Sequence, residues 1–188
     1  GSNYRGQIGR DDIGGVQTTA REVVIGSSSY NGLGFASTKI AAGDKFACTI
    51  MNGKTQCWGD NSHGQLGRNS TTAAFGNPSE LLGSPIQAGK SIDLTTGANH
   101  ACSITNGDVY CWGNNSDGQF GNATTTSSRT PVMAHHELAV LGENKPYRLA
   151  SGDAHSCAIA NGKVACWGSG SSGQLGGNDV VSSNIPKL

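Results

Sequence analysis

Apolar residues along this chain fall in short alternating runs that have the length of a β-strand. The clearest two runs, 101–104 and 109–112, flank the dipeptide Asn106-Gly107. Such a pattern predicts a β-hairpin with a type I′ turn, because both central residues of that turn need positive φ and Asn and Gly tolerate it best. No apolar run approaches the roughly 18 residues that a membrane-spanning helix needs. The pattern therefore predicts a protein of short antiparallel strands.

The same hairpin occurs three times, and each copy ends in Cys-Trp-Gly and is followed by a Gly-Gln-x-Gly segment. The glutamines of these segments, Gln65, Gln119 and Gln174, follow one another at intervals of 54 and 55 residues. A partial copy at 3–10 matches 61–68 at five of eight positions. Periods of this length are typical of propeller blades and other repeat arrays.

Two further strand candidates in each repeat raise the count to four strands. One precedes the hairpin and the other follows the Gly-Gln-x-Gly turn, as at 92–95 and 130–133. We therefore predict an all-β chain of three four-stranded propeller blades and a partial one, with an N-terminal helix as an open alternative. The expected divisions are a cloning remnant at 1–2, a partial repeat or an N-terminal helix and linker at 3–38, and repeats at 39–91, 92–146 and 147–188.

The six cysteines form one pair in each predicted hairpin. With Asn106-Gly107 at the centre of the turn, Cys102 lies directly opposite Cys111, where Cα atoms approach to about 4.5 Å and a disulfide can form. A zinc site fits less well, because metal-binding cysteines usually lie two to four residues apart. We predict no metal site and three disulfides: Cys48–Cys57, Cys102–Cys111 and Cys157–Cys166. Persistent disulfides need an oxidising compartment, so we expect an extracellular or cell-surface location.

The repeated residues also resemble those of a known family. The Gly-x-x-His-x-Cys segment, the Trp-Gly pair and the Asn-x-x-Gly-Gln-Leu-Gly turn resemble the repeat of the regulator of chromosome condensation (RCC1) family, and the cysteines suggest its secreted bacterial type. The resemblance implies a propeller of four-stranded blades, commonly seven, that presents loops to another macromolecule. The sequence departs from the family in having only three complete repeats and in carrying paired cysteines, which intracellular members would not need.

The N-terminal segment fits a second interpretation. Ile13, Val16 and Val23 fall at helical spacing, and the acidic pair Asp11-Asp12 would favour a helix N-terminus. The region from Tyr4 also looks like the segment that follows the membrane helix of type IV pilins. This interpretation predicts a helix over residues 4–24.

Composition narrows the class of partner. The 188 residues carry 13 Lys and Arg against 13 Asp and Glu, so the formal net charge is zero. Binding to nucleic acid or to an anionic membrane needs clustered Lys and Arg, and the sequence has no such cluster. We expect a protein or a cell-surface ligand as partner, no nucleic acid and no membrane contact. A homo-oligomer and a longer parent chain both stay open.

Motifs of catalysis are missing from the sequence, including Gly-x-Ser-x-Gly, a phosphate-binding loop and His-Glu-x-x-His. His100 and His155 occupy a repeat position that Phe46 fills in the first copy, which indicates packing. We therefore predict no enzyme, no catalytic residue and no cofactor. Interaction residues are expected where the repeats differ, and capping of the blade ends is the equally weighted alternative for them. The candidates are Tyr30, Phe35, Phe75, His135 and His136.

The function predicted from these observations is an extracellular or cell-surface protein-interaction module on a disulfide-linked, propeller-like scaffold. Two alternatives stay open. One is the soluble domain of a type IV pilin-like surface or adhesion subunit that carries such repeats, and the other is an inhibitor of a secreted enzyme.

Overall fold

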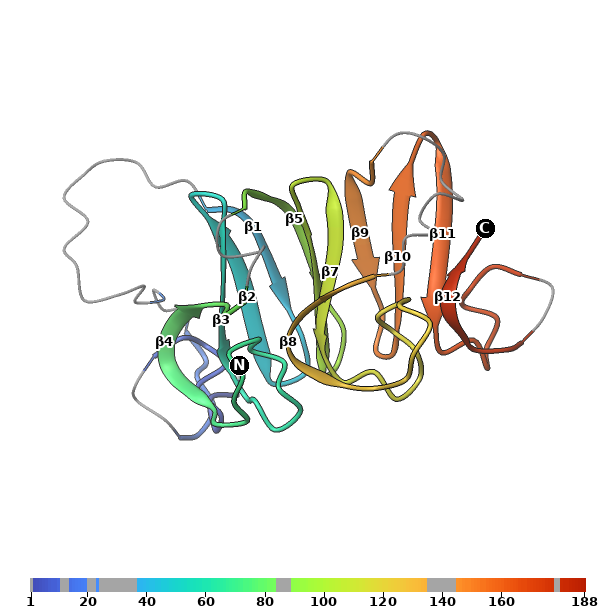
Figure 1. The fold of residues 1–188 in the computed structure, drawn as a ribbon. Helices are drawn as coiled ribbons and strands as arrows, with labels where there is room; N and C mark the ends of the chain where they lie inside the picture. Colours follow the sequence, from blue (N-terminus) through green and yellow to red (C-terminus); the bar gives the residue numbers. More distant parts are fainter. Residues whose placement is uncertain are drawn as a thin grey trace.

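The computed structural model describes residues 2–10, 14–19, 23, 37–83, 89–134, 145–177 and 180–188. These residues contain twelve strands in three four-stranded antiparallel sheets, and no helix is present among them. Figure 1 shows the three sheets side by side, in chain order from the N-terminal to the C-terminal side. The all-β, blade-like fold predicted from the repeats is therefore confirmed.

Each sheet forms one blade, and its strands are hydrogen-bonded in chain order. Blade 1 contains β1 (Ser37–Ala42), β2 (Phe46–Met51), β3 (Lys54–Gly59) and β4 (Ala74–Glu80). Blade 2 contains β5 (Ser91–Thr96), β6 (His100–Thr105), β7 (Asp108–Gly113) and β8 (Ser128–Met133). Blade 3 contains β9 (Arg148–Ser151), β10 (His155–Ala160), β11 (Lys163–Gly168) and β12 (Ser183–Lys187).

The Asn-Gly turns fix the register of every blade. Asn52 and Gly53 both have positive φ, 52° and 74°, as a type I′ turn requires. The turns at 106–107 and 161–162 repeat this geometry. In each hairpin the two cysteines face each other and form a disulfide, with Cα atoms 4.1 Å apart. The Asn-Gly turns therefore determine which cysteines face each other in all three disulfides.

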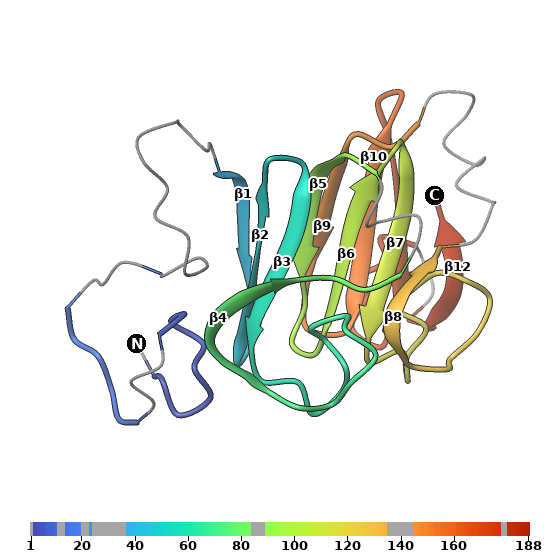
Figure 2. The ribbon, with the colours of Figure 1, turned by 60° about the vertical axis from the view of Figure 1, so that its left-hand side comes forward.

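The core lies between the blades. The inner strands β1, β5 and β9 pack side by side (Figure 1), and Figure 2 shows the same stack of sheets turned by 60°. One apolar cluster joins blades 1 and 2 and a second joins blades 2 and 3, with Trp112 and Trp167 as their largest members. All six residues of β6 are buried, because a blade covers each face of its sheet. In β10 buried and half-buried residues alternate, so only one of its faces is fully covered.

The N-terminal segment is a partial repeat. Gly6 N donates to Asn3 O and Gly9 N to Gly6 O, the pattern that Gly64 and Gly67 make in blade 1. The helix expected over residues 4–24 under the pilin interpretation is wrong for the described residues of that range, which form turns, bends and one bridge residue, Val16. The Asn3 side chain explains the turn, since its Oδ1 accepts from Ile8 N. No helix in the described chain is long and apolar enough to cross a membrane.

The two ends of the stack differ in character. At one end, called the loop end, the connections 60–73, 114–127 and 169–182 are each 14 residues long and carry the Gly-Gln-x-Gly turns. At the other end, called the linker end, the Asn-Gly turns meet the connections between blades. These connections, 81–90 and 134–147, differ in length and sequence. The connections at the loop end therefore repeat one length and one turn motif, whereas the connections at the linker end differ from each other.

We expect the middle disulfide to contribute more stability than the last one. Replacing Cys102 and Cys111 together by Ala removes a cross-link closed over nine residues and opens space in a site with no exposed surface. The expected loss of unfolding free energy in urea denaturation is about 3–4 kcal/mol, of which loop closure supplies about 2.5. The matched pair Cys157 and Cys166, at the less covered edge, should lose about 1 kcal/mol less. Equal losses would contradict the difference in packing.

Candidate functional site

The structure gives a partial answer for the interaction residues expected from the sequence. Tyr30, Phe35, His135 and His136 lie outside the described residues. Phe75 belongs to β4 at the loop end, and its side chain is not described. The cysteines are all paired within their own hairpins. Among the described residues, no three His, Cys, Asp or Glu side chains come together as a metal-binding group.

A tryptophan–carbonyl bond joins each repeat to the one before it. Trp112 Nε1 donates to Gln65 O of blade 1 at 2.8 Å, and Trp167 Nε1 donates to Gln119 O of blade 2 at 2.8 Å. Trp58 makes the same bond to Gln7 O of the N-terminal turn at 3.0 Å. In each case the indole N–H donates to a main-chain carbonyl in the Gly-Gln-x-Gly turn of the preceding repeat. We call this contact the blade joint.

The glutamine side chain holds that carbonyl in place. Gln65 Oε1 accepts from His63 N at 2.8 Å, and Gln119 Oε1 accepts from Asp117 N at 2.9 Å. Gln7 and Gln174 make the equivalent bond in their own turns. Sequence reasoning identified these segments only as turns. The signal that could have revealed the joint was that each complete repeat contains both a Trp and, seven residues later, a Gln.

A second polar link crosses the interface between blades 2 and 3. His100 Nε2 lies 2.9 Å from Ser156 Oγ, which in turn donates to Gln119 O at 3.1 Å. Since the Ser156 hydroxyl donates to the carbonyl, it accepts from a protonated Nε2. Burial, with a smaller contribution from the nearby His155, lowers the pKa of His100 from 6.5 to about 4, although a hydrogen bond to the Asp153 backbone opposes the shift in part. His100 is thus a neutral structural residue.

Asp93 links all three inner strands. Its carboxylate is almost fully buried and pairs with Lys39 Nζ of blade 1 at 2.9 Å. Its other oxygen accepts from Leu149 N of blade 3 at 2.7 Å. A buried carboxylate that lost one of these partners would be costly, so Asp93 fixes the relative placement of the blades.

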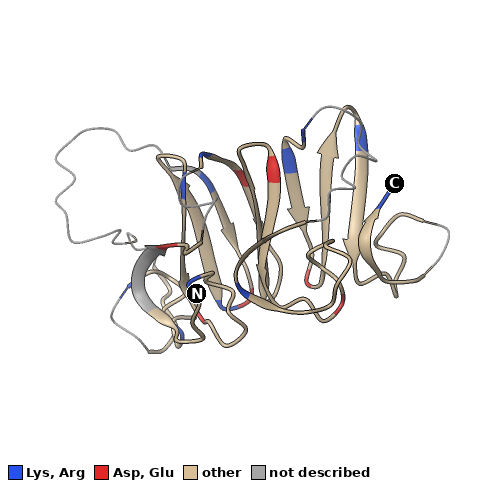
Figure 3. Cartoon of the chain, in the orientation of Figure 1, with Lys and Arg blue, Asp and Glu red and all other residues tan. Residues whose placement is uncertain are grey.

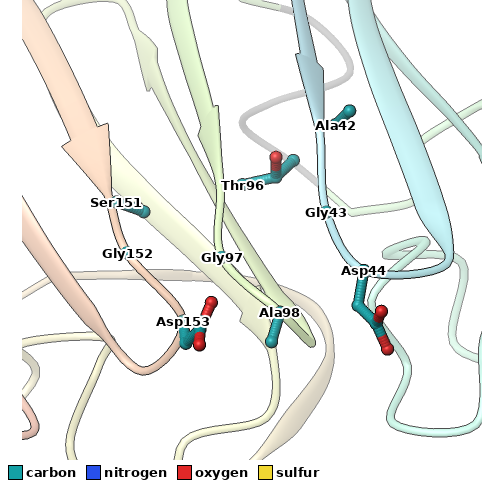
Figure 4. Close-up of a pocket in the computed structure, with 9 residues that line it drawn as sticks. All are labelled: Ala42, Gly43, Asp44, Thr96, Gly97, Ala98, Ser151, Gly152 and Asp153. Atoms are coloured by element: carbon teal, nitrogen blue, oxygen red, sulfur yellow. The ribbon is translucent and has the colours of Figure 1, made fainter.

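An open cleft lies where the inner strands end at the loop end. Figure 4 shows its lining, three equivalent tripeptides at 42–44, 96–98 and 151–153. The cleft has a volume of about 550 Å³. The middle residue of each tripeptide is glycine because a Cβ there would clash with the ring of Phe46, His100 or His155. Asp44 N donates to Ala98 O and Ala98 N to Asp153 O, so a backbone ladder crosses its floor. Two carboxylates, Asp44 and Asp153, stand at the rim, and Asp44 lies 3.5 Å from Lys45 Nζ.

Charged residues of both signs are scattered over the described chain. In Figure 3 the segments coloured for Lys and Arg and those coloured for Asp and Glu are interspersed along the ribbon, and neither kind is confined to one part of it. Ion pairs such as Lys145–Asp108 and Arg5–Asp60 join residues of opposite sign at 3.9 and 3.8 Å. The described surface therefore has no large region of positive or of negative electrostatic potential.

Comparison with known proteins points to one family of repeats. The family model for the regulator of chromosome condensation (RCC1) repeat matches residues 106–159, and a second model of the same repeat matches residues 92–119. The human E3 ubiquitin-protein ligase HERC2 is 31% identical over 170 residues, which cover 89% of this chain and 3% of that protein.

Solved structures show the same fold. Human WBSCR16 aligns with 98% of this chain and 44% of its own, with a TM-score of 0.74 and 21% identity. Yeast RCC1 (Prp20), solved bound to Kap60, aligns with 80% of this chain and 36% of its own, with a TM-score of 0.65 and 21% identity. The chain thus spans less than half of each of these proteins.

The blade joint should be measurable by a single substitution. Trp112→Phe keeps an aromatic side chain but removes the N–H that bonds the buried Gln65 carbonyl and leaves a small space. We expect a loss of about 2–3 kcal/mol in urea unfolding. Trp58→Phe is the matched control, because Gln7 is half-buried and water can replace the indole. A cost for Trp58→Phe as large as that for Trp112→Phe would argue against the joint.

Stability should depend on pH through His100. Because its pKa is about 4 in the folded chain and near 6.5 when unfolded, the unfolded state binds an extra proton between these values. Stability is therefore complete above pH 6.5 and falls, by up to about 3 kcal/mol, as the pH drops to 4. The double variant His100→Phe, Ser156→Ala copies the pair Phe46 and Ala101 at the equivalent positions of blades 1 and 2. The unfolding free energy of this variant should not show the fall between pH 6.5 and pH 4 that is due to His100. An unchanged pH dependence would contradict the role of His100.

Proposed function

Since the chain carries repeats of the regulator of chromosome condensation (RCC1) family, we propose that it is an extracellular or cell-surface protein-interaction module that binds its partner at the linker end. It acts by binding and not by catalysis. The observation that carries this proposal is the contrast between a repeated, cross-linked body and the varied connections at one of its ends.

The body supports the role of a scaffold. Each blade has a disulfide between its central strands, and each repeat is bonded to the preceding one through a tryptophan. Many of the buried polar groups serve contacts between blades, as Asp93 and Ser156 do. Such a body keeps the strands on which its loops begin and end in fixed positions, as a binding scaffold requires.

The linker end supports the location of the binding face. Its connections meet an Asn-Gly turn through side-chain contacts: Lys90 N donates to Asn106 Oδ1 at 3.1 Å, and Lys145 Nζ donates to Asn106 O at 2.9 Å. Of the candidate residues, His135 and His136 belong in sequence to the connection that starts at Ala134. The proposal leaves out three candidates: Phe75 belongs to β4 at the loop end, and Tyr30 and Phe35 precede β1 in the sequence.

The relatives support a protein as partner. The yeast protein with this fold was solved bound to another protein, Kap60. Because this chain covers only part of those proteins, the identity of its own partner is a separate question. The even distribution of charge favours a protein over nucleic acid. An inhibitor of a secreted enzyme would be one form of the same binding role.

The three disulfides support the proposed location. Disulfides persist in oxidising compartments, whereas glutathione and thioredoxin reduce most of them in the cytosol. Alkylation of the protein, unfolded without reductant directly from its source, should modify none of the six cysteines. Six alkylated cysteines would place the protein in a reducing compartment.

The binding face can be tested with two matched variants. In the first, residues 135–144 are replaced by a Gly-Ser segment of equal length. In the second, the exposed loop-end residues Ser62 and Ser116 are replaced by Ala. The immobilised protein first captures a partner from the surface extract of the source cells, and the purified partner is then titrated against both variants. We expect the linker variant to lose at least about tenfold in affinity and the loop-end variant less than about twofold. The reverse order would contradict the proposal.

A further inference from the structure

We propose that the linker end recognises an acidic segment of the partner protein, which places carboxylates on a row of lysines and an apolar side chain on Ile92 and Tyr147. This inference rests on the proposed function, because it names the chemistry of the partner that the linker end binds. It follows from the exposed charged and apolar side chains that lie around the Asn-Gly turns.

Lysines gather around these turns. Two of them precede the inner strands of blades 2 and 3 at equivalent positions, and two directly follow a turn: Lys90 and Lys145, and Lys54 and Lys163. We call these four residues the lysine row. Among the residues that directly flank the three turns, Asp108 is the one acid, and its carboxylate lies 3.9 Å from Lys145 Nζ. The row therefore carries more positive charge than Asp108 offsets.

The two lysines that precede inner strands are held in place by the turns. A methyl group added to Gly53 would lie 2.9 Å from Lys90 Cγ, and one added to Gly107 would meet the Lys145 side chain. Lys90 N donates to Asn106 Oδ1 at 3.1 Å, and Lys145 Nζ donates to Asn106 O at 2.9 Å. Both lysines are exposed. An ammonium group has three N–H donors, so each can also bind a carboxylate while its stem stays ordered against a turn.

Two exposed apolar side chains lie beside the lysine row, on the inner strands. Ile92 is 50% exposed and Tyr147 is 47% exposed. They directly precede Asp93 and Arg148, which occupy equivalent positions of β5 and β9 in the strand register. The two strands pack side by side, and Leu149 N donates to the Asp93 carboxylate at 2.7 Å. Ile92 and Tyr147 therefore lie at the same level of adjacent strands, and an exposed tyrosine is typical of residues that dominate binding energy.

The charges at the two ends of the stack favour the linker end for an acidic segment. The cleft at the loop end has the carboxylates of Asp44 and Asp153 at its rim, with Lys45 beside Asp44. A segment rich in Asp and Glu would be repelled by these carboxylates and attracted by the lysine row. The row is short, so it acts through close contacts within an otherwise even mixture of charges.

A protein segment fits the lysine row better than nucleic acid does. Nucleic acid presents phosphates along its whole length and needs many clustered Lys and Arg, whereas this row is short and Asp108 offsets part of it. The pair Ile92 and Tyr147 also needs an apolar side chain, which a protein segment can carry next to its carboxylates. We therefore assign the row to Asp and Glu side chains of a protein.

The test titrates peptides against the isotope-labelled full chain and follows its amide signals by NMR. The probe is a short soluble peptide of Glu residues with Leu at intervals. One matched peptide has every Glu replaced by Gln, and another has every Leu replaced by Ser. We expect the probe to shift the amides of Lys90, Ile92, Lys145 and Tyr147, and each matched peptide to bind at least about fivefold more weakly. The loss with the Gln peptide should shrink at high salt.

Variants of the chain locate the contact. The pair Lys90→Gln and Lys145→Gln, and separately Tyr147→Ala, should each weaken binding of the probe at least about fivefold. The matched controls lie at the loop end: Lys45→Gln, whose side chain is 57% exposed, and Tyr4→Ala, whose residue is 66% exposed. Because these controls remove the same side chains from the other end, they should change the affinity by less than about twofold.

Asp108→Asn should have the opposite effect. It removes the carboxylate that offsets Lys145, so binding of the probe should become about twofold tighter. The same substitution in the presence of Lys145→Gln should bring a smaller gain, because the lysine that it releases is absent. A gain in affinity cannot come from loss of the fold, so this variant keeps the test valid if another variant unfolds.

Three outcomes would overturn the proposal. The Gln peptide binds as tightly as the probe, which means that the carboxylates are not recognised. The probe shifts only amides of the loop end, or none. Single-stranded DNA binds more tightly than the probe and is insensitive to Tyr147→Ala, which assigns the lysine row to a polyanion.

Failure of this inference and failure of the proposed function give different results. The captured partner is titrated against the variants of the lysine row and of Tyr147, beside the replacement of residues 135–144. If that replacement weakens the partner and these variants do not, the linker end is still the binding face and only the acidic chemistry is wrong. If the loop-end variant alone weakens the partner, both are wrong.

Discussion

The hydrogen bond from a tryptophan indole to the glutamine carbonyl of the preceding repeat is the interaction on which the rest of this structure depends. It joins residues 47 to 51 positions apart, so it is a contact between repeats and not within one. Each blade alone is a small four-stranded sheet that leaves its apolar faces uncovered. The joint brings two such faces together, and the apolar clusters between blades follow from it.

Local chemistry prepares both partners of the joint. The Asn-Gly turn sets the register that brings the cysteines together, and the tryptophan follows directly on the second cysteine. On the other side, the glutamine side chain binds its own turn and thereby turns the main-chain carbonyl outward. A few residues of each repeat therefore specify a contact between repeats. This explains how the turn at 3–10 can bond the Trp58 indole through the Gln7 carbonyl.

The sequence alone was sufficient for the strands, the hairpins and the cysteine pairs, because these depend on residues near one another in the chain. It was not sufficient for Asp93 or Ser156, whose roles depend on partners in other blades. The helix predicted over residues 4–24 was wrong for the described residues, because the Asn3 side chain and the bonds of Gly6 and Gly9 fix a turn at the start of that range. Interaction residues were the hardest to predict, since the segments that differ between repeats have no pattern to compare.

The central claim is that the blades form one cooperative body through their tryptophan joints. Hydrogen exchange of the Trp112 and Trp167 indole N–H groups, followed in increasing urea below the unfolding transition, tests it most directly. If the joints hold the stack together, both indoles exchange only through global unfolding, and the free energy of exchange falls with the same urea dependence as global stability. Exchange of either indole with a clearly smaller urea dependence than that of global unfolding would show that the blades separate before the chain unfolds, and would contradict the account.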